Sequence, residues 1–183
     1  LEQVSKIQAV VMDKTGTLTE GKPKITDVVA SKGFTEDDII VINAAAEAKS
    51  SHPLSLAVLA EAKRRKVTVS TNVERFKNLA GHGVEAVVDG KHVLVGTLKL
   101  MHDSNVDITP LQQDIDRLLS EGKTIMILAV DNIIAGVAAV LDPVKENAKI
   151  AIIRMQELGL EVAMITGDNK KTAQTIGKQL GID

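Results

Sequence analysis

The chain has 183 residues, of which 44% are hydrophobic and 25% are charged, and its formal net charge is −2. This balance predicts a folded globular chain and argues against disordered, collagen-like and coiled-coil classes. We expect no nucleic-acid partner, because no excess of positive charge can neutralise phosphates and only two Phe could stack on bases. Cysteine is absent, which excludes disulfides, zinc–thiolate sites and thiol nucleophiles.

The beginning of the chain predicts a segment of a longer protein. Residues 1–6 carry neither an initiator Met nor the apolar core of a signal sequence. Residues 7–12 are apolar and predict a buried strand that opens into a polar loop over residues 13–17. No apolar run reaches the roughly 18 residues that a membrane-spanning helix needs, so we expect no membrane crossing in this segment.

A pair of helices is predicted next. Thr35 and Asp38 have capping-box spacing, and apolar residues follow at helical intervals, which predicts a helix start. Pro53 fits the first turn of a second helix and favours an extended conformation at His52. That helix ends in the basic run of residues 63–66, which we interpret as a solvated helix end that complements the helix dipole.

The middle of the chain has the pattern of an antiparallel sheet, and the end has the pattern of parallel α/β structure. Strand-like periodicity holds over residues 67–96. The remaining predicted elements are a hairpin over 84–95 that turns at Asp89-Gly90, a helix from Thr109-Pro110 to Gly122, a hairpin over 124–141 that turns at Asp131-Asn132, a helix from Pro143 to about Leu158, a strand over 162–165, a loop over 166–168 and a last helix that runs to Gly181.

We therefore expect an α/β unit that is interrupted by an inserted antiparallel α+β module. The predicted boundaries are 1–23 and 142–183 for the two segments of the α/β unit and 24–141 for the insertion. The chain crosses between the two units twice. Both crossing segments carry a proline, at Lys22-Pro23 and at Asp142-Pro143, which suits a two-strand hinge.

Asp13 is the first candidate catalytic residue. A carboxylate at the carboxyl end of a buried strand can act as a nucleophile toward a phosphoryl group when a cation and backbone donors neutralise the charge. Gly16 lets backbone amides approach an anion, and Thr15, Thr17 and Thr19 supply hydroxyl groups. The alternative is an Asx-type turn that follows a strand and has no chemistry.

A second loop with similar character lies near the end of the chain. The strand over residues 162–165 leads into Thr166, Gly167 and Asp168 and then into a helix, whose N-terminus favours an anion. The two strand ends are predicted to face one crevice. The alternative role for Asp168 is to cap the last helix, which needs no ligand.

Three motifs carry a family resemblance. Residues 13–19 (DKTGTLT) resemble the phosphorylation motif of P-type ATPases, ion pumps of the haloacid dehalogenase superfamily. Residues 51–54 (SHPL) resemble an element of the heavy-metal-transporting (P1B, copper/zinc/cadmium) branch, and residues 166–169 (TGDN) resemble the later phosphate-site loop. The resemblance implies an α/β fold in which a truncated haloacid dehalogenase-like, Rossmann-type phosphorylation domain contains an inserted α+β nucleotide-binding domain.

The resemblance also implies catalytic roles and cofactors. Asp13 would accept the γ-phosphoryl group of ATP, and Asp13 together with the Thr15 backbone carbonyl would hold Mg²⁺. Thr166 and Asp168 would contact the phosphate and order the cation, in keeping with phosphoryl transfer as positioning and charge neutralisation. Lys14 and Gly167 complete the implied catalytic set as members of the same two motifs.

The implied nucleotide site lies in the insertion. Glu47 and His52 resemble the adenine-site pair, Gly81 and Gly83 resemble glycines that let the nucleotide lie against the backbone, and Gly96 resembles a third close-approach glycine. Each has a plainer alternative. Glu47 could be a solvated helix residue, His52 a loop cap, and the two glycines around residue 82 a turn before a strand.

The sequence also departs from the family pattern. Ser51 stands where the branch often has Glu and Thr97 where Asn is common, which puts the nucleotide contacts there in doubt. The chain stops before the superfamily's active-site Lys and its last Mg²⁺-binding Asp, so we expect little or no turnover by this segment alone. Haloacid dehalogenase phosphatases usually carry a second Asp two residues after the nucleophile, as general acid and base, and here Thr15 has that position.

We therefore interpret the sequence as the ATP-binding and phosphorylation region of a heavy-metal P-type ATPase. The resemblance implies a cytoplasmic domain of an integral membrane protein, whose partners are ATP and the actuator domain and transmembrane helices of the same protein. The alternatives are a small-molecule phosphatase of the superfamily, a nucleotide-binding module without chemistry of its own, and a scaffolding role. The transported ion stays open.

Overall fold

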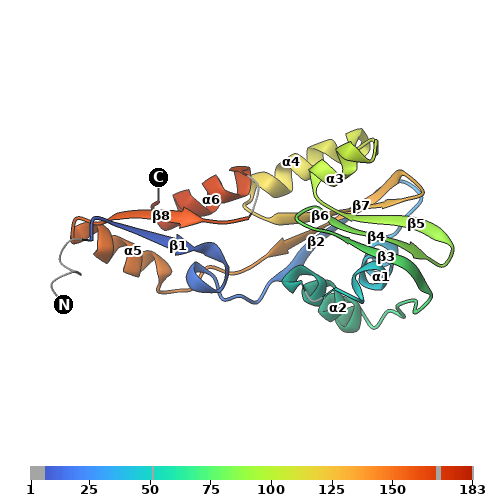
Figure 1. Cartoon of the computed structure of the whole chain (residues 1–183), viewed down its shortest axis with the longest axis horizontal. Coiled ribbons are helices and arrows are strands. Elements are labelled where there is room, and N and C mark those ends of the chain that lie inside the picture. The colour runs from blue at the N-terminus through green and yellow to red at the C-terminus, as the bar shows by residue number, and fades with distance from the viewer. Residues whose placement is uncertain (1–6, 51, 168–169, 183) are drawn as a thin grey trace.

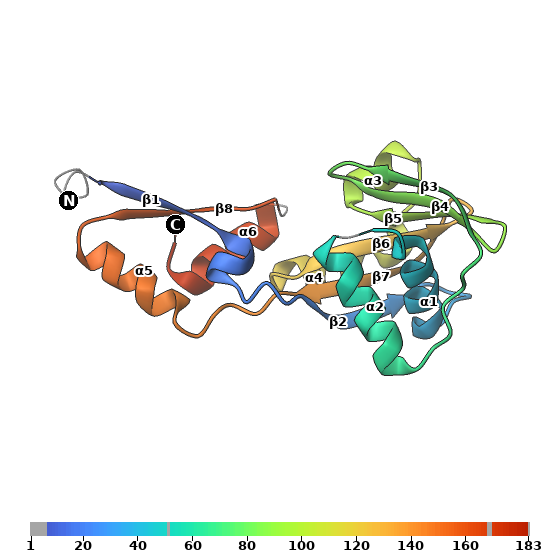
Figure 2. The same ribbon diagram turned by 60° about the horizontal axis from the view of Figure 1, so that its bottom comes forward.

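The computed structural model describes residues 7–50, 52–167 and 170–182, which form an elongated molecule with one β-sheet toward each end (Figure 1). The smaller sheet pairs β1 (Ala9–Asp13) in parallel with β8 (Glu161–Ile165). The larger sheet is antiparallel and has the strand order β2-β7-β6-β5-β4-β3. The chain leaves the small sheet after β1 and returns to it for β8, as Figure 2 shows from a second side.

The remaining elements fill in this plan. The strands of the larger sheet are β2 (Lys24–Ala30), β3 (Val73–Leu79), β4 (Gly83–Val88), β5 (Lys91–Gly96), β6 (Thr124–Val130) and β7 (Ile133–Leu141). The helices are α1 (Glu36–Glu47), α2 (Pro53–Arg65), α3 (Leu98–Asp103), α4 (Gln112–Ser120) with a 3-10 turn (Thr109–Leu111) before it, α5 (Ala148–Glu157) and α6 (Lys170–Leu180).

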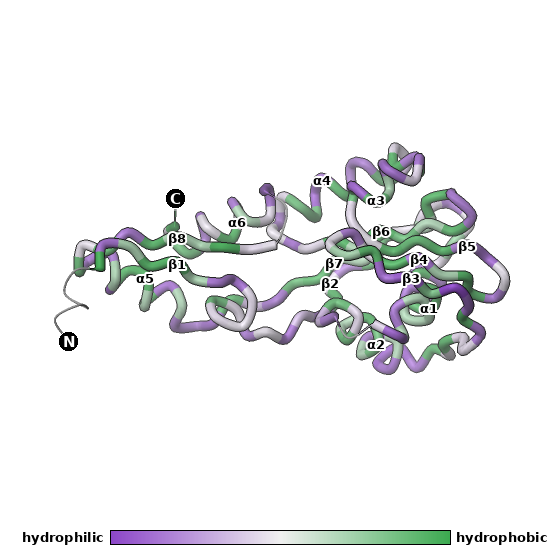
Figure 3. Tube along the Cα trace, in the orientation of Figure 1, coloured by the Kyte–Doolittle hydropathy of each residue, from purple (hydrophilic) through white to green (hydrophobic). Residues whose placement is uncertain are grey.

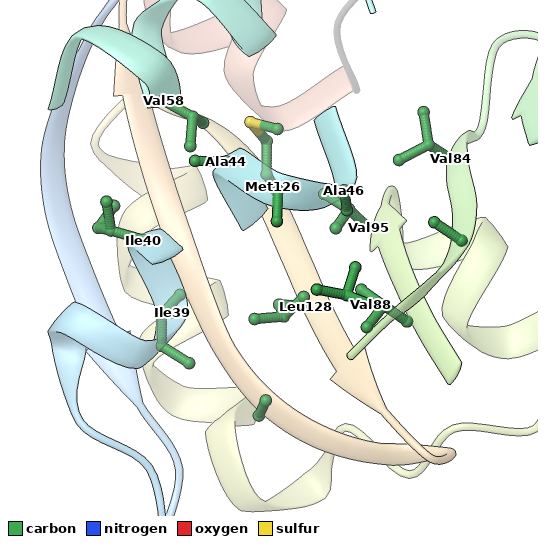
Figure 4. Close-up of a cluster of buried hydrophobic side chains, with 14 of the residues drawn as sticks. Ile39, Ile40, Ala44, Ala46, Val58, Val84, Val88, Val95, Met126 and Leu128 are labelled. Carbon is green, nitrogen blue, oxygen red and sulfur yellow. The ribbon is translucent and has the colours of Figure 1, made fainter. Parts of the chain in front are cut away.

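The larger sheet is covered on both faces. Helices α1 and α2 pack on one face through an aliphatic cluster that includes Ile39, Val58 and Leu128 (Figure 4). Helices α3 and α4 cover the other face through a second cluster that includes Ile115 and Ile127. A strand with two covered faces needs apolar residues at nearly every position, and β6 and β7 show this as continuous hydrophobic stretches (Figure 3).

Both predicted hairpins are confirmed, with two-residue turns at the expected positions. Asp89 and Gly90 have φ values of 51° and 79°, and Asp131 and Asn132 have φ values of 48° and 63°. Asp, Asn and Gly tolerate this left-handed conformation, which matches the twist of the paired strands.

The predicted starts of α1 and α2 are also confirmed. Thr35 and Asp38 form a reciprocal capping box at the start of α1. Pro53 is the first residue of α2, and His52 before it is extended, with φ −67° and ψ 142°. The pair of helices thereby brings the end of α1 and the start of α2 together.

Two sequence predictions need correction. The helix expected from Pro143 begins five residues later, at Ala148, because the chain here pairs with the first crossing segment: the Glu20 N–H donates to the Pro143 carbonyl at 2.9 Å, and Val144 forms a β-bridge with Thr19. The strand-like pattern expected from residue 67 becomes a strand only at Val73.

The basic run at the end of α2 was also interpreted wrongly in part. The Arg65 side chain is only 20% exposed, and its guanidinium donates to Glu61 within α2 and to Glu36 and Asp37 in the first turn of α1. Arg65 therefore joins the two helices that carry the nucleotide-site candidates instead of extending into solvent.

The small sheet is covered on one face only. Side chains of β1 and β8 alternate between intermediate and exposed positions, and the inward ones pack on a third core formed by Leu18, α5 and α6. On the outer face, Val11 and Ile165 are 66% and 61% exposed. Within the residues that the structure describes, no helix is both long enough and apolar enough to span a bilayer.

The Glu61 carboxylate should make the fold sensitive to acid. Hydrogen bonding from Arg64 lowers the pKa of Glu61 from 4.5 to about 2, with Arg65 adding to the effect and burial opposing it. A depressed pKa stabilises the folded state above pH 4.5, and this contribution is lost as the pH falls from 4.5 toward 2. We expect Glu61→Gln to lower the free energy of unfolding by about 1–2 kcal/mol at pH 7, and by less at pH 3.5.

Urea unfolding at pH 7, 5 and 3.5 measures this difference. Glu157→Gln, an exposed change of the same chemistry at the end of α5, is the matched control and should alter neither the stability nor its pH dependence. An unfolding free energy that changes with pH identically in Glu61→Gln and the unmodified chain would contradict the assignment.

Candidate functional site

The small parallel sheet brings the two predicted catalytic loops to one edge. Asp13 is the last residue of β1 and is paired in register with Ile165, the last residue of β8. The turn over residues 14–18 and the residues Thr166 and Gly167 therefore leave the sheet side by side, which confirms that the two strand ends meet. Asp13 lies on the exposed face of its strand, accessible to a ligand.

The loop after Asp13 is organised around the buried Thr19 hydroxyl. Thr19 is 1% exposed, and its N–H donates to the Lys14 carbonyl at 3.0 Å. The Gly16 N–H donates to the Thr19 hydroxyl oxygen at 3.2 Å. Gly16 has φ +76° and open space at the position of a Cβ, so the turn uses the conformational freedom of glycine without a packing constraint.

Asp142 fixes this loop from the other crossing segment. Its carboxylate lies 2.5 Å from the Thr19 hydroxyl oxygen and accepts the Lys22 N–H at 3.0 Å. The Lys14 carbonyl also lies 3.1 Å from the Thr19 hydroxyl oxygen, but a hydroxyl has one proton, and the carboxylate is the stronger acceptor. The two crossing segments are therefore tied together at the base of the Asp13 loop.

Lys145 adds a positive charge to the same loop. Its ammonium group donates to the Gly16 carbonyl at 2.7 Å. Neither Lys145 nor Asp142 is predicted as a site residue from the sequence, because residues 142–143 have the pattern of a hinge that continues into a helix. The local sequence held no signal against a helix, because Asp before Pro is the usual pattern of an N-cap and a first helical residue.

The Glu47 carboxylate is buried between α1 and α2. Glu47 is 5% exposed, and the Ser55 hydroxyl donates to its Oε2 at 2.5 Å while lying 2.8 Å from the Ser50 hydroxyl. The alternative of a solvated helix residue is therefore wrong. A carboxylate has about four acceptor positions, so Glu47 can accept further donors from a ligand at the end of α1.

His52 lies in the segment that follows Glu47, and it caps α2. Its Nδ1 accepts the Leu54 N–H at 3.2 Å, so the cap role considered for His52 is confirmed. With Nδ1 acting as acceptor, the neutral ring carries its proton on Nε2 and presents a donor away from the helix.

Two of the three predicted nucleotide-site glycines are first of all needed for strand packing. Gly83 and Gly96 are paired across β4 and β5. A Cβ on Gly83 would lie 2.0 Å from the Val95 carbonyl oxygen, and one on Gly96 would lie 2.1 Å from the His82 carbonyl oxygen. Gly81 differs, since it has φ +73° and open space around it. The nucleotide role of all three glycines stays a prediction.

The structure describes part of the Mg²⁺ site that the resemblance implies. Asp168, which would order the cation, lies outside the described residues, as does Ser51 of the nucleotide-site element. Over residues 7–50, 52–167 and 170–182, the His, Asp and Glu side chains form no group of three or more that could hold a metal ion. The Asp13 carboxylate and the Thr15 carbonyl belong to exposed residues and are hard oxygen ligands of the kind that Mg²⁺ prefers, so the residues present fit part of a coordination shell.

Comparisons with known proteins agree with this geometry. Residues 7–183 match the family model of the haloacid dehalogenase-like hydrolases. A copper-exporting P-type ATPase of Bacillus subtilis (strain 168) is 41% identical over 182 residues, which are 100% of this chain and 23% of that protein. The chain thus spans less than a quarter of that relative.

Solved structures give the same fold. A zinc-transporting PIB-type ATPase in its E2.Pi state superimposes with a TM-score of 0.70 and 31% identity, over 100% of this chain and 29% of that one. The catalytic domain of the CPx-ATPase CopB-B has a TM-score of 0.72 at 22% identity, over 100% of this chain and 61% of that one, and supports the fold alone.

Gly96 should tolerate no side chain. We expect Gly96→Ala to lower the free energy of unfolding by about 3 kcal/mol or more, since the new Cβ overlaps backbone atoms of the adjacent strand. Gly81→Ala is the matched control, because it adds only left-handed strain of roughly 1 kcal/mol in open space. Chemical denaturation measures both, and equal losses would contradict the close-approach role of Gly96.

Asp142 should stabilise the conformation of the loop that follows Asp13. We expect Asp142→Asn to weaken the charge-assisted bond to Thr19 and to raise amide hydrogen exchange over residues 13–22 by about tenfold, the effect of losing roughly 1.4 kcal/mol. Asp114→Asn, at an exposed surface ion pair with Arg117, is the control. Hydrogen-exchange mass spectrometry tests the expectation, and unchanged exchange in this peptide would exclude Asp142 as the residue that fixes the loop.

Proposed function

Because the chain belongs to the haloacid dehalogenase-like hydrolases, we propose that it is the cytoplasmic ATP-binding and phosphorylation region of a heavy-metal cation-transporting P-type ATPase, phosphorylated on Asp13. The observation that carries this proposal is the register of β1 and β8, which sets Asp13 beside the Thr166-Gly167 turn. The similarity to a copper-exporting P-type ATPase over the whole chain supports it. Residues 1–23 and 142–183 would form the phosphorylation domain, and residues 24–141 the nucleotide-binding domain.

In the proposed reaction the Asp13 carboxylate is the nucleophile. One carboxylate oxygen attacks the γ-phosphorus of ATP, the bond from that phosphorus to the β–γ bridging oxygen breaks, and ADP leaves with the electron pair. Mg²⁺, held by the Asp13 carboxylate and the Thr15 carbonyl, would neutralise phosphate charge when bound. Lys145, whose ammonium group lies on the Gly16 carbonyl, adds a positive charge at the loop.

The nucleotide would be held by the insertion. The buried Glu47 carboxylate accepts one hydroxyl hydrogen bond from Ser55 and has capacity for the exocyclic amine of adenine. His52 would offer its Nε2 proton or its ring face to the base. The open space around Gly81 would let the nucleotide approach the backbone. Asp168, Gly83 and Gly96 keep their predicted roles as parts of the same proposal.

The phosphatase alternative is disfavoured by the residue at position 15. Phosphatases of this superfamily usually have a carboxylic acid there, which protonates the leaving group and activates water, and Thr15 has no such group. An acyl phosphate on Asp13 would therefore persist until another part of the protein admits water. In the proposed pump this partner is the actuator domain, joined through transmembrane helices of the same protein.

The test is the covalent phosphate. With labelled ATP, the full-length protein should form a hydroxylamine-sensitive acyl phosphate, and Asp13→Asn should abolish it, while this 183-residue chain carrying Asp13→Asn keeps its affinity for ATP. Asp114→Asn is the matched control for both measurements. Glu47→Gln should weaken ATP binding by about tenfold, since a charged hydrogen bond is worth roughly 1.5 kcal/mol.

The outcomes separate the candidate functions. Retained ATP binding without any acyl phosphate in the full-length protein would favour a nucleotide-binding module. A phosphoenzyme that survives Asp13→Asn would exclude Asp13 as the acceptor.

A further inference from the structure

The inserted module touches helix α6 at a place separate from the crossing segments. Helix α6 begins shortly after the Thr166-Gly167 turn, and its first half lies against the end of α4. Figure 1 shows this contact on the upper side of the molecule and the crossing segments on the lower side. The two modules therefore have a third point of attachment, in addition to the two crossing segments that connect them.

The contact is made by α6 side chains that lie against backbone carbonyls of α4 and of the residues that follow it. The Thr172 hydroxyl donates to the Lys123 carbonyl at 3.0 Å, and the Lys171 ammonium donates to the Asp116 carbonyl at 3.0 Å. The Thr175 hydroxyl lies 3.4 Å from the Ser120 carbonyl oxygen. Thr175 also donates to the Lys171 carbonyl within α6 at 3.0 Å, so the bonds from Thr172 and Lys171 are the ones that join the two modules.

The end of α4 is shaped to allow this approach. The Gly122 N–H donates to the Leu119 carbonyl and the Lys123 N–H to the Leu118 carbonyl, which is the Schellman ending of a helix. A Cβ on Gly122 would lie 3.0 Å from the Thr175 Cγ2 atom, so glycine here serves both the turn and the contact with α6.

Thr172 is the most deeply buried member of the contact. It is only 1% exposed, so its hydroxyl donates to the Lys123 carbonyl where water does not compete. Lys123 is in turn fixed to the inserted module, because its ammonium group forms an ion pair with Asp27 of β2 at 2.7 Å. The hydrogen bond from Thr172 thus reaches the first strand beyond the hinge through a single residue.

We propose that Thr172 is a positioning residue that, through Lys123, fixes the orientation of the inserted module relative to the Thr166-Gly167 turn. Two crossing segments alone permit rotation about the line that joins them, and a contact away from that line restricts the rotation. The inference rests on the proposed function, since its consequence is the placement of the ATP γ-phosphate over Asp13. In-line transfer is sensitive to displacements of about 1 Å.

Two substitutions at Thr172 separate the hydroxyl from the shape of the side chain. Thr172→Val keeps the shape and removes the donor, whereas Thr172→Ser keeps the donor. In the full-length protein we expect Thr172→Val to slow phosphoenzyme formation from ATP about fivefold, which is the effect expected from the loss of one hydrogen bond. The ATP affinity of the 183-residue chain should stay within about twofold, and Thr172→Ser should restore the rate.

A distance measurement tests the orientation directly, without depending on catalysis. The chain has no Cys, so spin labels can be placed on cysteines introduced at the exposed positions Lys91, in the inserted module, and Lys149, in α5. Thr172→Val should broaden the distance distribution between the labels, and Thr172→Ser should not.

A second pair of variants covers the case in which Thr172→Val fails to fold. Lys171→Ala removes a donor from the same contact at a side chain that is 47% exposed, and it should also broaden the distribution. Lys178→Ala, in the last turn of α6, is the matched control and should not.

Unchanged distances in both Thr172→Val and Lys171→Ala would overturn the proposal. So would a loss of ATP affinity in Thr172→Val equal to its loss of phosphoenzyme rate, because a general loss of structure would then explain both. If the unmodified full-length protein forms no phosphoenzyme, the proposed function fails, while the distance measurement still decides whether Thr172 sets the orientation.

Discussion

The parallel pairing of β1 and β8 is the constraint on which the rest of the structure depends. The two strands lie at opposite ends of the chain, and their register sets the end of β1, with Asp13, beside the end of β8. Only strands that run in the same direction present both carboxyl ends at one edge. The inserted module can therefore be large and antiparallel without disturbing the site, because the chain leaves and re-enters at neighbouring positions.

The loop after Asp13 and the connection between the modules share one set of hydrogen bonds. Thr19 receives the Gly16 N–H and contacts the Asp142 carboxylate, which also accepts the Lys22 N–H. A change in the angle between the crossing segments would therefore be transmitted to the turn that follows Asp13. Close coupling of this kind suits a site where, in the proposed reaction, the phosphoryl group has to arrive at a defined position relative to Asp13.

Several residues in the insertion serve folding and the proposed ligand at once. Gly83 and Gly96 let β4 and β5 approach closely, and the same absence of side chains is what the nucleotide proposal uses. His52 caps α2 with Nδ1 and keeps Nε2 available. Glu47 is held by Ser55 in a buried position that would be unfavourable without donors. The groups that the proposal assigns to nucleotide binding are thus fixed in place by contacts that the fold itself needs.

The sequence by itself determined the local structure and carries the motif on which the proposed acceptor role of Asp13 rests. Capping at Thr35, Pro53 at the start of α2 and the turns at residues 89–90 and 131–132 depend on neighbours in the chain, and the structure has each of them. Residues 13–19 are contiguous, so their motif could also be found without coordinates.

Only the tertiary structure decided the contacts between distant segments. The start of α5 moved to Ala148 because residues 142–145 pair with residues 18–22, and no local propensity reports such a partner. The roles of Asp142 and Lys145, the burial of Glu47 and the bond from Thr172 to Lys123 follow from the same cause. Each depends on contact between groups far apart in sequence. Such contacts are stabilised by the packing of the whole chain, which the local preferences of the residues involved do not report.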